Sequence, residues 1–209
     1  MPIHAALLAI TIAVTGEVQE AGPGQVCGDA EYVIDCLGVP IAADGLDLGA
    51  YVGQTVRLVA VETFDPCGSL DVLAVEPAPA TLTLCGTAAP GCAMRLRSAP
   101  GGAAEHIVLG AGEVGFVPIG PNLGTLLLNV PIVILFQTFS AGFEPAGAKV
   151  ELQIPNSPAL VGLEVRMQAA RRDILPIFPG NPPVGPWRLS NVVCLDVAEA
   201  LGACAPADC

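Results

Sequence analysis

The chain has 209 residues, of which 53% are hydrophobic and 13% are charged, whereas globular domains usually carry about 25% charged residues. Its net charge of −12 would be repelled by phosphate backbones and anionic lipid, so nucleic acid is not expected as a partner. A chain with so few charges either buries an unusually large core or covers part of its surface with another subunit, and self-association or binding to other surface proteins is therefore expected.

An apolar segment, residues 5–14 (AALLAITIAV), stands near the start of the chain. It is too short to span a bilayer, and it lacks the preceding Lys or Arg of an export signal. Residues 9–18 alternate with the two-residue period of a strand, which favours a β-strand. An incomplete export signal is the alternative, and addition of this strand to a neighbour's sheet is a further one. No membrane span is expected.

Short strands are expected along the rest of the chain, because 24 Gly and 20 Pro interrupt every stretch long enough for an amphipathic helix. A single helical turn is expected at residues 46–51. The strands are predicted at residues 8–18, 31–36, 55–62, 70–76, 81–85, 93–97, 106–109, 125–129, 132–138, 149–154, 163–170 and 188–197.

A cluster of acidic residues lies in the first part of the chain and offers oxygen ligands for calcium. A solvated acidic face is the alternative, because the ligand spacing of known calcium loops is missing. The weak calcium candidates are Asp29, Glu31, Asp35, Asp44 and Asp47.

Charge divides the chain into two modules. Residues 1–79 hold 11 acidic side chains and one basic one, Arg57, whereas residues 80–209 hold 9 acidic and 7 basic ones. Pro77 and Pro79 favour an extended connector at the break. The predicted organisation is an acidic module at residues 1–79, a second module at 80–197 and a cysteine-containing tail at 198–209.

The eight cysteines have no C-x2-C spacing, so a metal site is disfavoured and disulfides are expected. Disulfides persist outside the reducing cytosol, which predicts an extracellular or cell-surface protein. The first module has three cysteines and the rest five, so complete pairing within one chain needs a bridge between the two. A local bridge between Cys85 and Cys92 is also expected. The disulfide candidates are Cys27, Cys36, Cys67, Cys85, Cys92, Cys194, Cys204 and Cys209.

Motifs of known enzyme classes are absent, so no catalytic, cofactor-binding or metal-binding residue is predicted. Glu105 and His106 are adjacent, but neighbours on a strand point to opposite faces, and His106 is interpreted as a surface residue. The single tryptophan, Trp187, is interpreted as closing the edge of a core, with stacking on a sugar ring as the alternative.

The first module resembles a small OB-like barrel over residues 14–76. The resemblance is carried by the Leu-x-x-x-Val-Gly-x-x-Val pattern in GLDLGAYVGQTVRLVAVETF. OB folds that bind oligonucleotides use basic grooves and stacking aromatic residues. Arg57 is the only basic residue of this module, so nucleic-acid binding does not follow from the resemblance.

The second module resembles a C-terminal β-sandwich module of secreted and surface proteins of environmental bacteria. The resemblance spans about residues 80–197 and rests on IPNSPALVGL (154–163), Gln168-Ala169 and Leu189-Ser190-Asn191. It implies a fold and an exported location, and brings no catalytic residues. In physical terms, Leu160 and Leu163 are expected in the core, and Gln168 is expected to bond backbone groups at a strand end.

These observations predict an all-β, disulfide-stapled protein with a small OB-like barrel followed by an antiparallel, jelly-roll-like β-sandwich. The predicted function is that of a non-enzymatic, exported structural or assembly protein at the cell surface, as a subunit of an extracellular filament or coat. The alternative is a carbohydrate- or calcium-dependent binding module of a secreted protein. A hydrolase with unidentified carboxylates is the remaining hypothesis.

Overall fold

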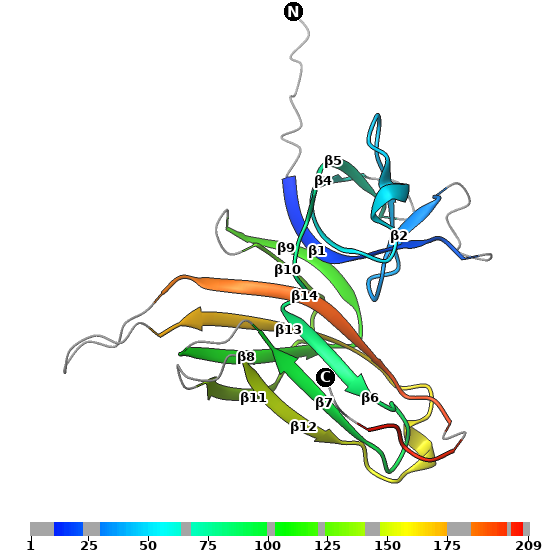
Figure 1. The fold of residues 1–209 in the computed structure, drawn as a ribbon, viewed down its shortest axis with the longest axis vertical. Helices are drawn as coiled ribbons and strands as arrows, with labels where there is room; N and C mark the ends of the chain where they lie inside the picture. The colour runs from blue at the N-terminus through cyan, green and yellow to red at the C-terminus, as the bar shows by residue number, and fades with distance from the viewer. Residues whose placement is uncertain are drawn as a thin grey trace, which may run out of the picture. The chain divides into compact units, whose positions relative to one another are not determined.

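A computed structural model describes residues 11–22, 30–63, 68–99, 103–120, 124–140, 147–174, 185–199 and 202–206. Within these ranges the regular structure is β-strand, apart from two short 3-10 helices. The predicted all-β class is therefore confirmed. The chain forms two compact units, Met1–Ala78 and Pro79–Cys209, each of which is described by itself (Figure 1).

The first unit is a closed five-stranded barrel. Its strands are β1 (Thr11–Glu20), β2 (Tyr32–Ile34), β3 (Val39–Ala42), β4 (Thr55–Glu62) and β5 (Leu70–Pro77). Their order around the barrel is β1-β2-β3-β5-β4, and antiparallel pairing of β1 with β4 closes it. Strand β3 runs parallel to β5, whereas the other neighbours are antiparallel. This is the OB-like barrel that the sequence predicts.

Alternation in β1 decides which side chains enter the barrel. Ile12, Val14 and Val18 are buried at every second position. Gly16 continues this inward row, and a Cβ there would lie 2.4 Å from Cγ2 of Ile34 on β2. Residues 11–14 therefore belong to the protein's own barrel, which contradicts their addition to a neighbour's sheet. Residues 5–10 lie outside the described residues.

A single 3-10 turn, η1 (Leu48–Tyr51), precedes β4, which confirms the predicted helical turn. The Asp47 carboxylate accepts a hydrogen bond of 3.1 Å from the Gly49 N–H and so caps the turn. Leu48 is buried in the core of the unit.

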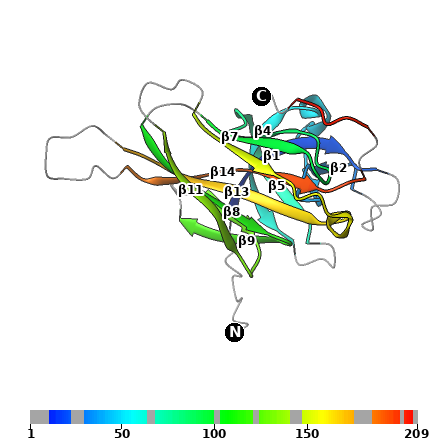
Figure 2. The ribbon, with the colours of Figure 1, turned by 90° about the horizontal axis from the view of Figure 1, so that it is seen from below.

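The second unit is a sandwich of two antiparallel sheets. One contains β11 (Val133–Ser140), β8 (Ala104–Ala111), β13 (Glu164–Asp173) and β14 (Trp187–Asp196), in that order. The other contains β12 (Ala148–Gln153), β7 (Ala93–Ser98) and β6 (Leu82–Gly86). Figures 1 and 2 show the two layers. The core between them contains Leu82, Leu96, Val108, Met167 and Ala169.

Asn191 joins the two sheets along one side. Its Oδ1 accepts hydrogen bonds of 2.9 Å from the N–H groups of Thr81 and Leu82, and its Nδ2 donates one of 2.9 Å to the Leu82 carbonyl. Asn191 lies on β14 and Leu82 on β6, and these two strands are not paired through their backbones. The Asn191 side chain therefore supplies the hydrogen bonds between them.

A two-stranded hairpin, β9 (Val114–Gly120) and β10 (Gly124–Leu128), completes the second unit. Gln168, on β13, is fully buried and holds β10 in place. Its Oε1 accepts from the Leu127 N–H at 2.9 Å, and its Nε2 donates to the carbonyls of Thr125 and Ser190 at 3.2 and 2.9 Å. Its predicted bonding to backbone groups is confirmed, although it lies within β13 rather than at a strand end.

The segment 154–163 forms a turn containing η2 (Pro158–Leu160). Leu160 packs against the cluster of Met94, Ile154 and Val197, as expected. The prediction for Leu163 is wrong, because its side chain is 44% exposed. Backbone bonds of Gly162 and Leu163 with Val197 align this segment with the end of β14 and leave the Leu163 side chain outside the core.

All twelve predicted strands are present, β4 with the predicted ends and the others with shifted ends, but β3 and β9 were not predicted. Each contains a proline, Pro40 in β3 and Pro118 in β9, and proline within an apolar run argues against a strand. The structure accommodates both because β3 is only four residues long and β9 pairs with β10 alone.

Disulfides staple the structure, as predicted. Cys92 is bonded to Cys204 with a Cα–Cα distance of 5.5 Å, which ties the C-terminal tail to the residue preceding β7. The expected bridge between Cys85 and Cys92 is therefore wrong. Cys36, Cys85 and Cys194 are also disulfide-bonded, and no described cysteine is free. Cys27, Cys67 and Cys209 lie outside the described residues, so a bridge between the modules stays a prediction.

Candidate functional site

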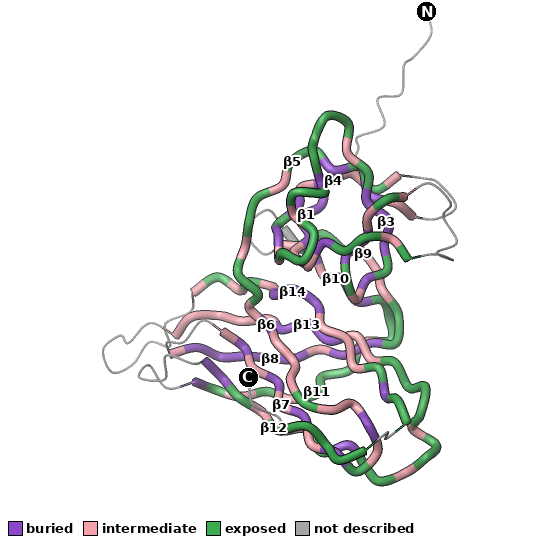
Figure 3. The backbone as a smooth tube through the Cα atoms, turned by 45° about the vertical axis from the view of Figure 1, so that its right-hand side comes forward, coloured by how far each residue is buried: buried purple, intermediate pink, exposed green. Residues whose placement is uncertain are grey.

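Strand β11, at the edge of the four-stranded sheet, stands out among the described strands by its exposed apolar side chains. Exposed apolar side chains concentrate on this strand and just before it, and Figure 3 shows that most of β11 is exposed or half-buried. They are Val130 (75% exposed), Val133 (54%), Ile134 (68%), Leu135 (40%) and Phe139 (63%). We call these five residues the apolar edge.

The exposure of the apolar edge has a local cause. Pairing of β11 with β8 is interrupted between Ile134 and Phe136, and the extra residue of such a bulge shifts the alternation of side chains. Phe136 packs against the core. Leu135 lies over Gly110, where a Cβ would come within 2.8 Å of Leu135 Cδ1. The neighbouring apolar residues are left at the surface.

Strand β11 also lacks two of the features that normally protect a sheet edge, although it keeps a third, the bulge between Ile134 and Phe136. Its sequence, VILFQTFS, contains no charge and no proline, although natural edge strands commonly carry one or the other. Of the other edge strands, β12 carries Lys149 and Glu151 and β14 carries Arg188 and Asp196, whereas β9 carries Pro118 and the five-residue strands β6 and β10 are uncharged. Among the described residues, β11 pairs with β8 on one side and with no strand on the other.

A row of polar and aromatic residues crosses the outer face of the same sheet. Phe139 on β11 is opposite Glu105 on β8, which is opposite Arg172 on β13, which is opposite Trp187 on β14. Glu105 forms an ion pair with Arg172 and accepts a hydrogen bond from Gln137. Arg172 lies over the Trp187 ring, 4.8 Å from its centroid. Arginine therefore covers one face of the tryptophan ring.

His106 points into the sandwich, so its interpretation as a surface residue is wrong. It is fully buried, with Nδ1 2.9 Å from Ser98 Oγ and Nε2 3.0 Å from Ser140 Oγ. Burial and, to a smaller extent, the charge of Arg171 lower the pKa of His106 from 6.5 to about 4, while Asp173 opposes the shift. The neutral imidazole links β7 of one sheet to β11 of the other. Glu105 points to the opposite face, as the sequence predicts.

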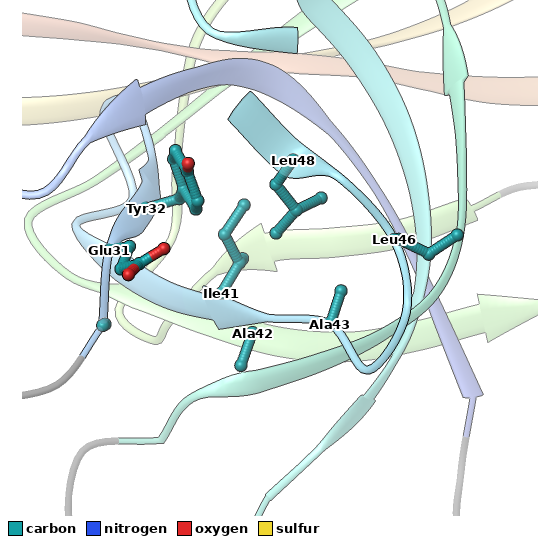
Figure 4. Close-up of a pocket in the computed structure, with 8 residues that line it drawn as sticks. Glu31, Tyr32, Ile41, Ala42, Ala43, Leu46 and Leu48 are labelled. Atoms are coloured by element: carbon teal, nitrogen blue, oxygen red, sulfur yellow. The ribbon is translucent and has the colours of Figure 1, made fainter. Parts of the chain in front are cut away.

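The first unit contains a cavity of about 230 Å³ between β2, β3 and the segment before η1 (Figure 4). Its polar groups are the Glu31 carboxylate and the Tyr32 hydroxyl, and the rest of the lining is apolar. The lining residues are Ala30, Glu31, Tyr32, Ile41, Ala42, Ala43, Leu46 and Leu48. This volume lies below the roughly 300–1,000 Å³ of most small-molecule sites.

Among the described calcium candidates, the structure groups no three side chains that could hold a metal ion. Glu31 lines the cavity and Asp47 caps η1, while Oδ2 of Asp35 lies 3.8 Å from the disulfide-bonded Cys36 Sγ. Asp44 lies in the segment between β3 and η1, and Asp29 is outside the described residues. Within the part of the chain that is described, no three His, Cys, Asp or Glu side chains are grouped to hold a metal ion.

Comparison with known proteins provides no assignment, because no family model, curated protein or solved structure matches the chain. In the described residues, no helix has the length and apolar character to cross a bilayer. The disulfides indicate an oxidising environment.

The sequence reasoning predicted an apolar surface but did not locate it. A signal was present: residues 130–136, VPIVILF, do not alternate and carry no charge. An unbroken apolar run of this kind is usually a strand buried on both faces. Only the sheet order shows that this strand lies at an edge.

Proposed function

We propose that the protein is a non-enzymatic structural or assembly subunit that is exported to the cell surface and acts in a filament or coat. The observation that carries this proposal is the apolar edge on β11, an uncharged edge strand with several apolar side chains exposed. Large exposed apolar patches mark surfaces that are covered by another molecule.

Two properties of the whole chain support the proposal. Charged residues make up only 13% of the sequence, so little of the surface is protected from association. The disulfides fit a protein that works outside the cell. The resemblance of residues 80–197 to a sandwich module of secreted and surface proteins points to the same location.

Imaging of the native material tests the proposal most directly. We expect antibody labelling of intact cells to reveal the protein at the surface, and negative-stain images of material released by mild shear to reveal polymers or sheets. A cytosolic protein of similar size provides the control for cell lysis. Recovery of the protein only as a dispersed species in the medium or inside the cell would contradict a structural role.

Carbohydrate binding is the second candidate function, and the aromatic row on the outer sheet face favours it. Phe139 is largely exposed and shares this face with Trp187, and aromatic rings combine an apolar surface with suitable geometry for stacking. Glycan arrays run with and without calcium would detect this activity. Binding that is lost in Phe139→Ala would favour this function over assembly.

A further inference from the structure

We infer that β11 pairs antiparallel with β11 of a second copy of this chain, which joins two four-stranded sheets into one continuous sheet. The inference deepens the proposed function, because it rests on the same apolar edge and names its partner. Three observations support a second copy as the occupant: the sheet order, the chemistry of the strand and the distribution of charge.

The sheet order leaves β11 able to accept a strand. Among the described strands, β8 is the one that pairs with β11, in antiparallel register from Val133 to Ser140. The opposite side of such a strand presents N–H and C=O groups in the pattern that another strand recognises. The described strands of the first unit offer no comparable edge, because the five of them form a closed barrel.

The chemistry of β11 suits pairing with itself. A two-fold axis that lies between two paired strands makes each strand antiparallel to its copy, so the same patch is used on both subunits. Like charges directly opposite each other destabilise such a pair, and β11 has no charged residue. Strands β12 and β14 each carry one positive and one negative side chain, so they avoid like-charge contacts with a copy of themselves only in particular registers, whereas β11 avoids them in every register. Self-pairing also places apolar side chains of one edge against those of the other.

The distribution of charge favours contact through the second unit. Residues 1–78 carry a net charge of −10, from 11 acidic and 1 basic side chain, whereas residues 79–209 carry −2, from 9 acidic and 7 basic ones. Two copies therefore repel each other most strongly through their first units. Screening by salt reduces this repulsion, so dimerisation through β11 is expected to strengthen as ionic strength rises.

The length of the strand limits the affinity. Eight residues on each side form a short interface, and interfaces of less than about 1,200 Å² are typical of weak or transient complexes. We expect a concentration-dependent dimer with a Kd of about 1 µM to 1 mM.

Sedimentation velocity with the oxidised full-length chain tests the inference. We expect the mass to rise from one copy of 21.1 kDa towards two copies as the concentration rises through this range, more readily at high salt. Ile134→Lys combined with Phe139→Lys should weaken the dimer at least about tenfold, because lysine on an edge strand opposes pairing. Leu73→Lys is the matched control, since Leu73 is 54% exposed on β5 of the barrel, and it should dimerise like the wild type.

Hydrogen exchange adds a readout of the backbone. Amides of β11 should become protected as the wild type dimerises, and they should not in the double lysine variant at the same concentration. Circular dichroism identical to that of the wild type establishes that the variant is folded. A dimer that forms equally well in the double variant, or that leaves β11 unprotected, overturns the inference.

These experiments distinguish failure of the β11 pairing from failure of the proposed structural role. A wild-type chain that stays monomeric at 1 mM overturns pairing with a second copy, while polymers in native material would still support an assembly role with another partner. A β11-dependent dimer together with native material that is wholly dispersed has the opposite meaning: the pairing stands and the proposed filament or coat does not.

Discussion

Three buried polar side chains hold the second unit together. Gln168 joins β13 to β10, Asn191 joins β14 to β6, and His106 links the two sheets through serine hydroxyls. Buried polar groups are costly unless they are paired. Here the pairing also specifies which strands lie together, because an apolar residue at these positions would not select a backbone partner.

Gln168 is expected to be among the most sensitive positions. Gln168→Leu removes three hydrogen bonds and leaves the Leu127 N–H and the carbonyls of Thr125 and Ser190 without this partner. At about 1–3 kcal/mol for each buried unpaired group, we expect a loss of about 3–5 kcal/mol in the free energy of unfolding.

Guanidinium denaturation under non-reducing conditions measures this loss, with Trp187 fluorescence as the signal because it is the only tryptophan and lies in the second unit. Gln153→Leu is the matched control: it removes one exposed hydrogen bond to the Gly91 carbonyl and should change the free energy by less than about 1 kcal/mol. Equal effects of the two substitutions would contradict the role of Gln168.

His106 makes the second unit less stable in acid. The histidine pKa is 6.5 in the unfolded chain and about 4 in the fold, so the unfolded chain binds the proton first as the pH falls. The stability of the fold that depends on a neutral His106 is fully present above pH 6.5 and is lost as the pH falls from 6.5 to 4. We expect about 2 kcal/mol less stability at pH 5 than at pH 7.

Denaturation of the wild type and of His106→Asn at several pH values measures this effect. The asparagine side chain keeps hydrogen-bonding groups near Ser98 and Ser140 but does not titrate in this range. Its unfolding free energy should vary less between pH 7 and pH 5 than that of the wild type. Parallel pH profiles for the two proteins would rule out His106 as the titrating group.

Local sequence patterns predict a strand where polar and apolar residues alternate or where a turn precedes it. They do not predict pairings that depend on contacts between distant segments. Strand β4 spans Thr55–Glu62 as predicted, because its alternation and the preceding Gly53 are local signals. The pairing of β3 with β5 is parallel and joins distant segments, so no local pattern reveals it. The bulge that turns the apolar edge outward is likewise visible only in the register with β8.

The contact between β1 and β2 provides a test at this scale. A Cβ at Gly16 would overlap Cγ2 of Ile34, so Gly16→Ala should destabilise the barrel by about 1–3 kcal/mol through overpacking. Ile34→Leu removes the branch at Cβ, and the double variant should recover part of the loss. Tyr32 and Tyr51 belong to the first unit, and their fluorescence reports its unfolding.

Gly22→Ala is the control for this test, because no described atom other than those of its chain neighbours lies within 4 Å of a Cβ at that position. Its effect on the barrel should be below about 1 kcal/mol. Two results would contradict the close packing of β1 on β2. One is a Gly16→Ala protein as stable as the wild type, and the other is a double variant that loses more free energy of unfolding than the two single variants together.

At the scale of the whole molecule, disulfides add to the stability that the short strands provide. The bridge between Cys92 and Cys204 spans 112 residues of sequence, and closing a long loop restricts the unfolded chain. Replacing the pair by Cys92→Ala and Cys204→Ser should lower the free energy of unfolding of the second unit by about 2–4 kcal/mol.

Tryptophan and tyrosine fluorescence report the unfolding of the two units separately in this experiment. Tryptophan fluorescence should show a lower denaturant midpoint for the second unit, whereas tyrosine fluorescence should show an unchanged midpoint for the first. An unchanged tryptophan transition would show that the bridge does not restrict the unfolded chain.

The sequence by itself determined the all-β class, the OB-like barrel followed by a sandwich, the positions of twelve strands and the use of cysteines as staples. These properties depend on alternation, on glycine and proline, and on cysteine spacing, all of which act over a few residues. Only the tertiary structure decided that Cys92 pairs with Cys204 rather than Cys85, that His106 is buried, and that the apolar residues of β11 lie on an edge. The physical reason is that these outcomes depend on contacts between segments far apart in the sequence, which a local pattern does not specify.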